Sequence, residues 1–231
     1  MGLPKEYLFA EQYQNKVAEF PVHLDLEINS QCNFQCAFCP QSEPEKKLFI
    51  HGSMNKETAK KIIKYFADNG TKTIKLFWRG EPTLNKNLPE LLKYSKECGL
   101  FTMLNTNGSF PLGNHQAVAD YLDWISFSID TYHIDKQNHH NQTKGILDII
   151  LHFKNFGVIT EIQTATPNAV LEVLCDMNDI KLNIDIPTKR TDSEYAHLDL
   201  SNKKRKDCGF PNWRMIITHD LKIKPCCPVW S

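Results

Sequence analysis

Three cysteines stand close together early in the chain, in the stretch Cys32-Asn33-Phe34-Gln35-Cys36-Ala37-Phe38-Cys39. Their x3 and x2 spacing allows all three thiols to converge on one metal centre. A structural zinc site usually takes four ligands, so zinc would need a further ligand such as His23 or His51. An iron–sulfur cluster held by only three cysteines keeps one iron open to another ligand. The spacing therefore indicates a reactive iron–sulfur site, with a zinc site as the alternative.

Short polar segments that could bind a small molecule follow three later apolar runs. These segments are Gly80-Glu81-Pro82, Asn105-Thr106-Asn107-Gly108 and Ser128-Ile129-Asp130. In the first, glycine permits close approach of the backbone and proline stiffens the turn. In the other two, short side chains suit contacts with carboxylate or hydroxyl groups. The simpler alternatives are that Glu81 is a solvated loop carboxylate and that Ser128 and Asp130 only end a strand.

The elements that must position these segments alternate along the chain. Apolar, β-branched runs alternate with helical patterns between about Val22 and Ile186, which predicts β–α units around a parallel sheet. The predicted strands are residues 22–28, 73–78, 100–104, 124–129, 158–164 and 181–186. Helices are predicted after Ser53, from about Leu88, near Val118, over 146–156 and from about Asn168. Six units fall short of the eight of a closed barrel, so we expect an α/β fold, a partial (β/α)6 TIM-like barrel.

The domain organisation follows from changes in composition. We expect an N-terminal extension over residues 1–20 and the barrel over 21–187. A polar linker is expected over 188–207, which includes the basic run Lys203-Lys204-Arg205-Lys206. Residues 208–231 form a small cysteine-bearing unit, with strand-like residues 214–218 and 222–224 around the turn His219-Asp220-Leu221. Catalytic groups are expected at the carboxyl ends of the barrel strands.

Composition excludes several classes of protein. The 231 residues include 27 basic and 27 acidic side chains, and this neutrality argues against a nucleic-acid or membrane-surface binder. With 41% hydrophobic residues, low-complexity disorder is excluded. No long apolar run or secretory leader is recognised, so the cysteines are expected in the reducing cytoplasm. Cys98 and Cys175 lie on predicted helices and are expected to pack as small apolar side chains.

The motifs together resemble a known family. Cys32-x3-Cys36-x2-Cys39, with Phe38 before the third cysteine, resembles the signature of the radical S-adenosylmethionine (radical SAM) superfamily. Gly80-Glu81-Pro82 resembles the GEP motif of that family, and residues 104–108 resemble its TNG segment. Residues 128–130 resemble the segment that contacts the cofactor ribose in relatives. All four occur in the family's order at the ends of predicted strands, and the resemblance covers residues 20 to about 190.

The resemblance implies a cofactor set and an activity. It implies a 4Fe-4S cluster on Cys32, Cys36 and Cys39 and S-adenosyl-L-methionine as the second cofactor. Reductive cleavage of S-adenosylmethionine would give a 5′-deoxyadenosyl radical that abstracts a substrate hydrogen. An external one-electron reductant of the flavodoxin or ferredoxin type is also implied. The resemblance implies that Phe38 lies against the adenine, with a place in the core as the alternative. It implies that Gly80, Glu81 and Pro82 lie near the ammonium group of S-adenosylmethionine. The other cofactor-binding residues that it implies are Asn105, Thr106, Ser128 and Asp130.

The C-terminal unit resembles the opening of a SPASM or twitch domain. The resemblance rests on the spacing of four residues. Twelve residues lie between Cys208 and Leu221, four lie between Leu221 and Cys226, and Cys227 follows directly. It implies an auxiliary iron–sulfur cluster, for which Cys208, Cys226 and Cys227 are the candidate ligands. Leu221 replaces the glycine of the pattern, and the later cysteines of relatives are absent. We therefore expect an incomplete SPASM/twitch-like unit, and idle or buried thiols are the alternative.

The substrate remains open between two kinds of molecule. Modification of a peptide or protein is preferred, and dehydrogenation of a small molecule such as an aminocyclitol is the alternative. A noncatalytic iron–sulfur or zinc module is the alternative from a different class. Such a module has no need for Gly80-Glu81-Pro82, residues 105–107 or Asp130. These segments therefore favour an oxidoreductase-like or peptide-modifying enzyme.

Overall fold

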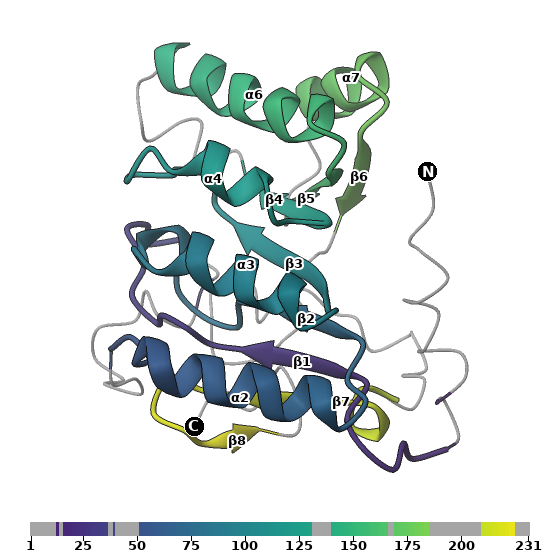
Figure 1. The fold of residues 1–231 in the computed structure, drawn as a ribbon. Helices are drawn as coiled ribbons and strands as arrows, with labels where there is room; N and C mark the ends of the chain where they lie inside the picture. Colours follow the sequence, from purple (N-terminus) through teal and green to yellow (C-terminus); the bar gives the residue numbers. More distant parts are fainter. Residues whose placement is uncertain are drawn as a thin grey trace.

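The computed structural model describes residues 13, 16–36, 39, 51–130, 140–165, 169–184 and 209–224. Its centre is an eight-stranded sheet in the order β6-β5-β4-β3-β2-β1-β7-β8 (Figure 1). All neighbouring strands are parallel except β7 and β8. The expected α/β fold with a partial TIM-like barrel is confirmed.

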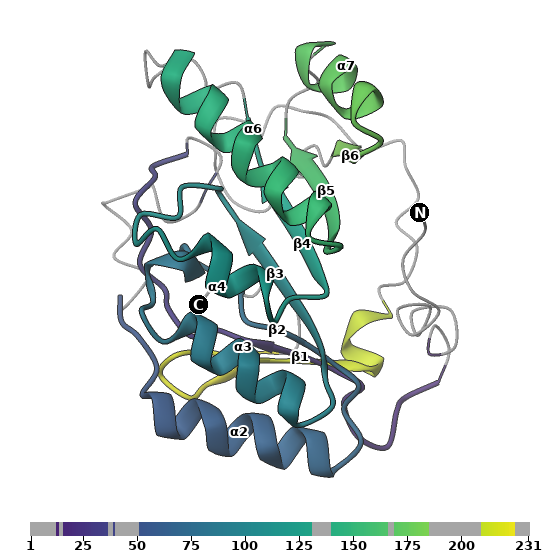
Figure 2. The same ribbon diagram turned by 45° about the horizontal axis from the view of Figure 1, so that its top comes forward.

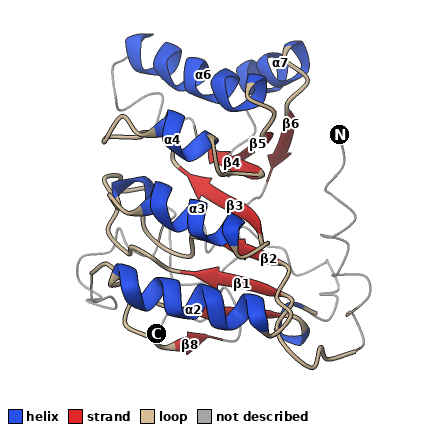
Figure 3. Cartoon of the chain, in the orientation of Figure 1, coloured by secondary structure: helices blue, strands red, loops and turns tan. Residues whose placement is uncertain are grey.

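The elements have the following bounds. The strands are β1 (His23–Leu26), β2 (Thr73–Lys75), β3 (Phe101–Thr106), β4 (Trp124–Ser128), β5 (Ile159–Thr164), β6 (Lys181–Ile184), β7 (Arg214–Ile217) and β8 (Ile223–Lys224). The α-helices are α2 (Lys56–Asp68), α3 (Leu88–Glu97), α4 (His115–Ala119), α6 (His140–Asn155) and α7 (Ala169–Met177). The described residues also include two short 3-10 helices, η4 (Pro82–Leu84) and η6 (Phe210–Asn212), and Figure 3 colours the helices and strands.

Two predicted boundaries differ from the structure for clear reasons. The second strand ends at Lys75 rather than at residue 78, because the chain turns there toward the Gly80-Glu81-Pro82 segment. The fourth predicted helix begins at His140 instead of 146. Its first turns are polar, and apolar periodicity cannot mark a polar helix start. The helix after Ser53 begins as predicted, since the Asn55 side chain accepts the backbone N–H groups of Glu57 and Thr58.

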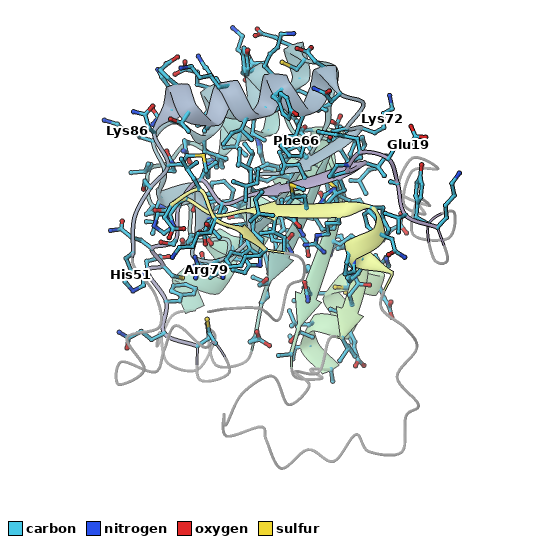
Figure 4. All side chains as sticks on the ribbon, turned by 90° about the horizontal axis from the view of Figure 1, so that it is seen from below. Glu19, His51, Phe66, Lys72, Arg79 and Lys86 are labelled. Carbon is cyan, nitrogen blue, oxygen red and sulfur yellow. The ribbon has the colours of Figure 1, made fainter. Side chains whose placement is uncertain are left out.

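The helices cover one face of the sheet (Figures 1 and 2). On β1 and just after it, Leu24, Leu26 and Ile28 point to this face and are almost fully buried. They belong to one apolar core with helix residues such as Ile63 and Phe66. In Figure 4, Phe66 lies between α2 and the sheet, and Arg79 lies on the opposite side of the sheet.

The opposite face of the sheet, which we call the inner face, carries the polar side chains of β1. Successive side chains of a strand point to opposite faces, so His23, Asp25 and Glu27 share the inner face. All three are buried. The Asp25 carboxylate pairs with Arg214 on β7 and with Lys75 on β2, at 3.4 Å from its Nζ. Buried charges persist only when paired, and these pairs join three neighbouring strands.

The C-terminal strands extend the barrel sheet, which the sequence pattern does not predict. Strand β7 lies parallel to β1, with Asp25 opposite Ile216 and Leu26 opposite Ile217. Ile217 also packs in the apolar core, while β8 pairs with β7 at the edge. The C-terminal hairpin, residues 214–224, is therefore continuous with the barrel. Among the described residues, no helix has the length and apolar character needed to cross a membrane.

Candidate functional site

The candidate site lies at the carboxyl ends of β1 to β4, where parallel strands deliver their following loops to one edge of the sheet. The cysteine loop follows β1, the Gly80-Glu81-Pro82 turn follows β2, and residues 107–109 follow β3. Ser128 ends β4, and Asp130 comes two residues later. The sequence motifs are therefore brought to one edge, as the predicted topology requires.

The cysteine loop places three thiols within a short segment. Cys32 is exposed, Cys36 and Cys39 are half-buried, and none is in a disulfide bond. The Cys39 N–H donates to the Cys36 carbonyl at 2.9 Å, which closes a turn between these two cysteines. Burial, together with the neighbouring Cys39 and Cys32 thiolates, raises the pKa of Cys36 to about 12. Binding to iron requires the thiolate form, so a cluster at this loop would have to displace the proton of Cys36.

The arrangement of the thiols is looser than that of a finished metal site. Within the described ranges, no three His, Cys, Asp or Glu side chains converge closely enough to hold an ion. The fit to a cluster therefore rests on the donor set, which is three sulfur ligands on one loop. The Asn107 amide lies 3.9 Å from the Cys32 sulfur, and it also donates to the Asn33 side chain at 3.0 Å. The segment after β3 thus contacts the beginning of the cysteine loop.

The buried Glu81 side chain links two of the motifs by hydrogen bonds. Only 1% of the residue is exposed, so it is not a solvated loop carboxylate. Its Oε1 accepts the Thr83 N–H at 3.0 Å and the Thr83 and Thr106 hydroxyls at 2.7 Å each. Its Oε2 accepts the Asn107 N–H at 2.7 Å. Burial raises the pKa of Glu81, and these hydrogen bonds oppose that rise. The carboxylate is thus engaged within the protein, where it fixes the turn after β2 to the end of β3.

Gly80 holds the same turn against the backbone that precedes Cys32. Its φ is +70°, a conformation that favours glycine. A Cβ atom at this position would lie 2.6 Å from the Gln31 carbonyl oxygen. The Glu81 N–H donates to the same oxygen at 2.7 Å, and the Asn29 amide donates to the Glu81 carbonyl at 2.9 Å. The turn after β2 and the loop after β1 are therefore locked together through their backbones.

Two other candidate residues have distinct surroundings. Asp130 is buried, and its Oδ1 accepts the Thr164 hydroxyl at 3.0 Å and the Ala165 N–H at 2.6 Å. This places Asp130 between the ends of β4 and β5. By contrast, Asn105 Oδ1 on β3 is buried and has no hydrogen-bond partner among the described residues. The same is true of Trp124 Nε1 on β4, and also of Asn114 Oδ1 and His152 Nε2. Such atoms are suited to a bound molecule.

Several residues of the site go unnoticed in the sequence. Glu27 is fully buried and binds Arg79, whose Nε and second terminal nitrogen lie 2.7 and 3.0 Å from the two carboxylate oxygens. His219 of the C-terminal hairpin also reaches Glu27, with its N–H at 3.1 Å and its Nδ1 at 2.9 Å from Oε2. The signal available in the sequence is the alternation of His23, Asp25 and Glu27 along one buried strand. Phe38, Cys208, Cys226 and Cys227 lie outside the described residues.

Comparison with known proteins gives consistent relatives. An S-adenosylmethionine-dependent nucleotide dehydratase of Lacinutrix mariniflava is 33% identical over 136 residues, which cover 57% of this chain and 28% of that protein. A GTP 3′,8-cyclase of Campylobacter fetus is 32% identical over 133 residues, 56% of this chain and 40% of that protein. The chain thus spans about a third of the length of these relatives.

Solved structures support the fold. Streptococcus suis SuiB bound to S-adenosylmethionine matches 96% of this chain and 63% of its own, with a TM-score of 0.67 and 16% identity. BtrN in complex with AdoMet and 2-DOIA matches 92% of this chain and 75% of its own, with a TM-score of 0.60 and 18% identity. The family model described as "Radical SAM superfamily" matches residues 26–171 of this chain. Because this match covers more than half of the sequence, the chain belongs to the radical SAM superfamily.

Proposed function

We propose that this chain carries the catalytic barrel of a radical SAM enzyme. The observation that supports it best is the contact chain that joins three motifs. Gly80 rests on the backbone of Ser30 and Gln31, Glu81 binds Asn107, and Asn107 contacts Cys32. A noncatalytic iron–sulfur or zinc module has no need for a second segment built against its metal loop. The same contacts suit a cofactor that bridges the cysteine loop and the turn after β2.

The residues of the chain bind and orient the cofactors in this proposal. Cys32, Cys36 and Cys39 hold a 4Fe-4S cluster. A bound, reduced cluster would supply the one electron needed for reductive cleavage of S-adenosylmethionine to methionine and a 5′-deoxyadenosyl radical, which would take a substrate hydrogen. Gly80 and Pro82 shape the turn whose backbone faces the ammonium of S-adenosylmethionine, while the Glu81 carboxylate fixes that turn.

The remaining cofactor contacts fall on the strand ends. Phe38 is proposed to lie against the adenine. The Asn105 side chain, whose Oδ1 has no partner among the residues that the structure describes, is suited to receive a hydrogen bond from the bound molecule. Thr106 already donates to Glu81, so its contribution is to hold the turn. Ser128 and Asp130 are proposed to face the ribose. The electron comes from an external reductant of the flavodoxin or ferredoxin type in the cytoplasm.

The inner face favours a neutral polar substrate such as a peptide. Three cations on this face pair with buried carboxylates: Lys75 and Arg214 with Asp25, and Lys181 with Glu161. Arg79, in the turn after β2, pairs with Glu27 in the same way. Binding of a phosphate would have to compete with these pairs. Trp124 Nε1 and Asn105 Oδ1, which have no hydrogen-bond partner among the described residues, are one donor and one acceptor of the kinds that a peptide group uses. We therefore infer peptide or protein modification, and hydroxyl-rich small molecules such as an aminocyclitol are the second candidate.

The C-terminal cysteines belong to a separate proposal. We infer that residues 208–231 form a SPASM/twitch-like unit joined to the barrel, residues 21–187, by a linker over 188–207 and preceded by an extension, residues 1–20. Cys208, together with Cys226 or Cys227, is the proposed ligand set for an auxiliary cluster. Iron analysis after reconstitution tests this point, since about four irons per chain mean one cluster and about eight mean two.

The decisive experiment is anaerobic reconstitution with iron and sulfide, followed by dithionite and S-adenosylmethionine. We expect 5′-deoxyadenosine from the parent and none from Cys36→Ala. Absence of the product from the parent, or equal amounts from both proteins, contradicts the proposal. For the substrate, peptide and small-metabolite fractions of a deuterium-labelled cell extract are compared. Deuterium in 5′-deoxyadenosine only with the peptide fraction supports peptide modification, and deuterium only with the metabolite fraction contradicts it.

A further inference from the structure

His219, in the C-terminal hairpin, contacts two residues, Glu27 and Gly52. Glu27 binds the turn after β2, and Gly52 binds the start of the cysteine loop. His219 lies in the turn between β7 and β8, far from the cysteine loop in the sequence. One edge of its ring faces the Glu27 carboxylate through Nδ1, at 2.9 Å. The other edge lies against Gly52, where a Cβ atom would come within 2.8 Å of the ring carbon Cδ2. His219 is therefore wedged between these two residues.

The first contact leads to the turn after β2. Glu27 accepts two hydrogen bonds from the guanidinium of Arg79, at 2.7 and 3.0 Å. Arg79 immediately precedes Gly80, and its guanidinium also stacks 4.3 Å from the centroid of the Trp78 ring. Facing a carboxylate, Nδ1 of His219 acts as a donor. The orientation of Glu27, and through it of Arg79, thus depends in part on His219.

The second contact leads to the cysteine loop. The Gly52 carbonyl accepts the Ser30 N–H at 2.9 Å, and the Gly52 N–H donates to the Ser30 hydroxyl at 2.9 Å. Ser30 lies two residues before Cys32, and its backbone is also the surface on which Gly80 rests. Because Gly52 has no side chain, the histidine ring can approach this backbone pair closely.

The hairpin is attached to the barrel by other contacts besides those of His219. Strand β7 pairs with β1 along four residues, and Arg214 binds the buried Asp25. Within the turn, the Thr218 hydroxyl donates to Asp220 Oδ1 at 2.5 Å and the Lys222 N–H donates to Thr218 at 2.9 Å. These contacts attach and close the hairpin, so we expect it to keep its place when the His219 side chain is replaced.

We propose that His219 is a positioning residue that sets the turn at residues 79–82 relative to the start of the cysteine loop, so that the C-terminal hairpin controls the affinity for S-adenosylmethionine. This inference rests on the proposed function. It assigns to the hairpin a role in the primary cofactor site that is independent of any auxiliary cluster on Cys208, Cys226 or Cys227.

Two substitutions in the full, anaerobically reconstituted chain separate the two contacts. His219→Phe keeps a ring against Gly52 and removes the side-chain donor to Glu27, while the backbone N–H of residue 219 is kept. His219→Asn keeps a side-chain N–H near the position of Nδ1 and removes the outer edge of the ring. Asp220→Asn is the matched control, because it alters the same turn but contacts neither Glu27 nor Gly52 through an observed bond.

Equilibrium dialysis with S-adenosylmethionine and amide hydrogen exchange give the two readouts. For His219→Phe we expect a Kd about tenfold higher than the parent's, from loss of a hydrogen bond to a charged group. We also expect faster exchange at the Glu81 and Thr83 amides. For His219→Asn we expect faster exchange at the Ser30 and Gly52 amides, with those of Glu81 and Thr83 unchanged. Asp220→Asn should resemble the parent in both readouts.

The outcomes distinguish this inference from the proposed function. A parent that neither binds nor cleaves S-adenosylmethionine contradicts the proposed function. A parent that binds it, with a Kd and exchange rates that His219→Phe leaves unchanged, overturns the role of His219 alone. If His219→Phe does not fold, Glu27→Gln provides the same comparison, since it weakens the bonds to both His219 and Arg79. A parental Kd and parental exchange at Glu81 in Glu27→Gln likewise overturn the inference.

Discussion

The Glu81 carboxylate and the Asn107 backbone N–H meet at 2.7 Å, although 26 residues separate them in the chain. Through this bond the turn after β2 holds the segment after β3. The Asn107 side chain in turn lies 3.9 Å from the sulfur of Cys32. One buried carboxylate is therefore two contacts away from the first cysteine of the candidate cluster site.

Replacing Glu81 tests this connection. Glu81→Ala removes the acceptor of four hydrogen bonds and leaves the buried Thr106 hydroxyl and Asn107 N–H without it. Unsatisfied buried donors are costly, so we expect the free energy of unfolding to fall by about 3 kcal/mol. Urea unfolding measures the change. Glu90→Ala is the control, because the Glu90 side chain is 45% exposed and its pairs with lysines are at the surface, so its loss should be much smaller. If both variants lost the same free energy of unfolding, the stabilising role of the Glu81 hydrogen bonds would be refuted.

Gly80 offers a comparison between two glycines of similar backbone conformation. Gly80 and Gly99 have φ of +70° and +79°, so alanine strains the backbone at both, by about 1 kcal/mol. Only at Gly80 does the added Cβ meet neighbouring atoms, 2.6 Å from the Gln31 oxygen, while nothing lies within 4 Å at Gly99. We expect Gly80→Ala to lose a further 1–3 kcal/mol or so of unfolding free energy from overpacking.

The affinity for S-adenosylmethionine provides the second readout for the same pair. Gly80→Ala must push the turn away from the residues that precede Cys32, so its Kd should rise. Gly99→Ala, at the end of α3, should leave the Kd unchanged. Similar stability and affinity in the two variants would show that the close contact at Gly80 has no consequence.

The sequence predicts those parts of the site that depend on local residue types. The cysteine spacing, the Gly80-Glu81-Pro82 turn and the polar residues after β3 and β4 are recognisable because each lies within one short segment. The parallel sheet follows from alternating apolar runs, and its topology brings these segments to one edge.

The contacts of the C-terminal hairpin could not be predicted in the same way. Glu27 and His219 are separated by 192 residues, and each is an ordinary polar residue in its own segment. The β1–β7 pairing depends on which strand edge remains open, and no local pattern records that. The role of the Glu81 carboxylate was also beyond sequence reasoning, because its four donors come from three residues that fold around it.

The iron content of cysteine variants tests the ligand set. Cys36→Ala should fall from about four irons per chain to well below this value after reconstitution, because the loop then offers two sulfur ligands. Cys98→Ala is a matched control, since Cys98 packs against the apolar core at the end of α3. Iron analysis and the visible absorbance of the cluster measure the effect. Full iron content in Cys36→Ala would contradict the proposed ligands.

The pH dependence of stability tests the buried charges on the inner face. Burial raises the pKa of Asp25, but Lys75, His23 and Arg214 outweigh that effect and hold the pKa well below its ordinary 3.8. A carboxyl group with a lowered folded-state pKa contributes stability that is fully present above its unfolded pKa. That contribution is lost as the pH falls below 3.8 toward the folded-state value.

Asp25→Asn makes this contribution visible in urea unfolding of the chain. Near pH 7 the substitution leaves Lys75 and Arg214 buried without their counter-ion, and we expect a loss of about 3 kcal/mol or more. The difference between parent and variant should shrink as the pH is lowered below 3.8, because the parent then loses the same charge. Asp68→Asn, at an exposed pair with Lys64, should show little difference at any pH. A gap between the parent and Asp25→Asn that stays constant through the acid range would mean that the Asp25 charge does not hold β1, β2 and β7 together.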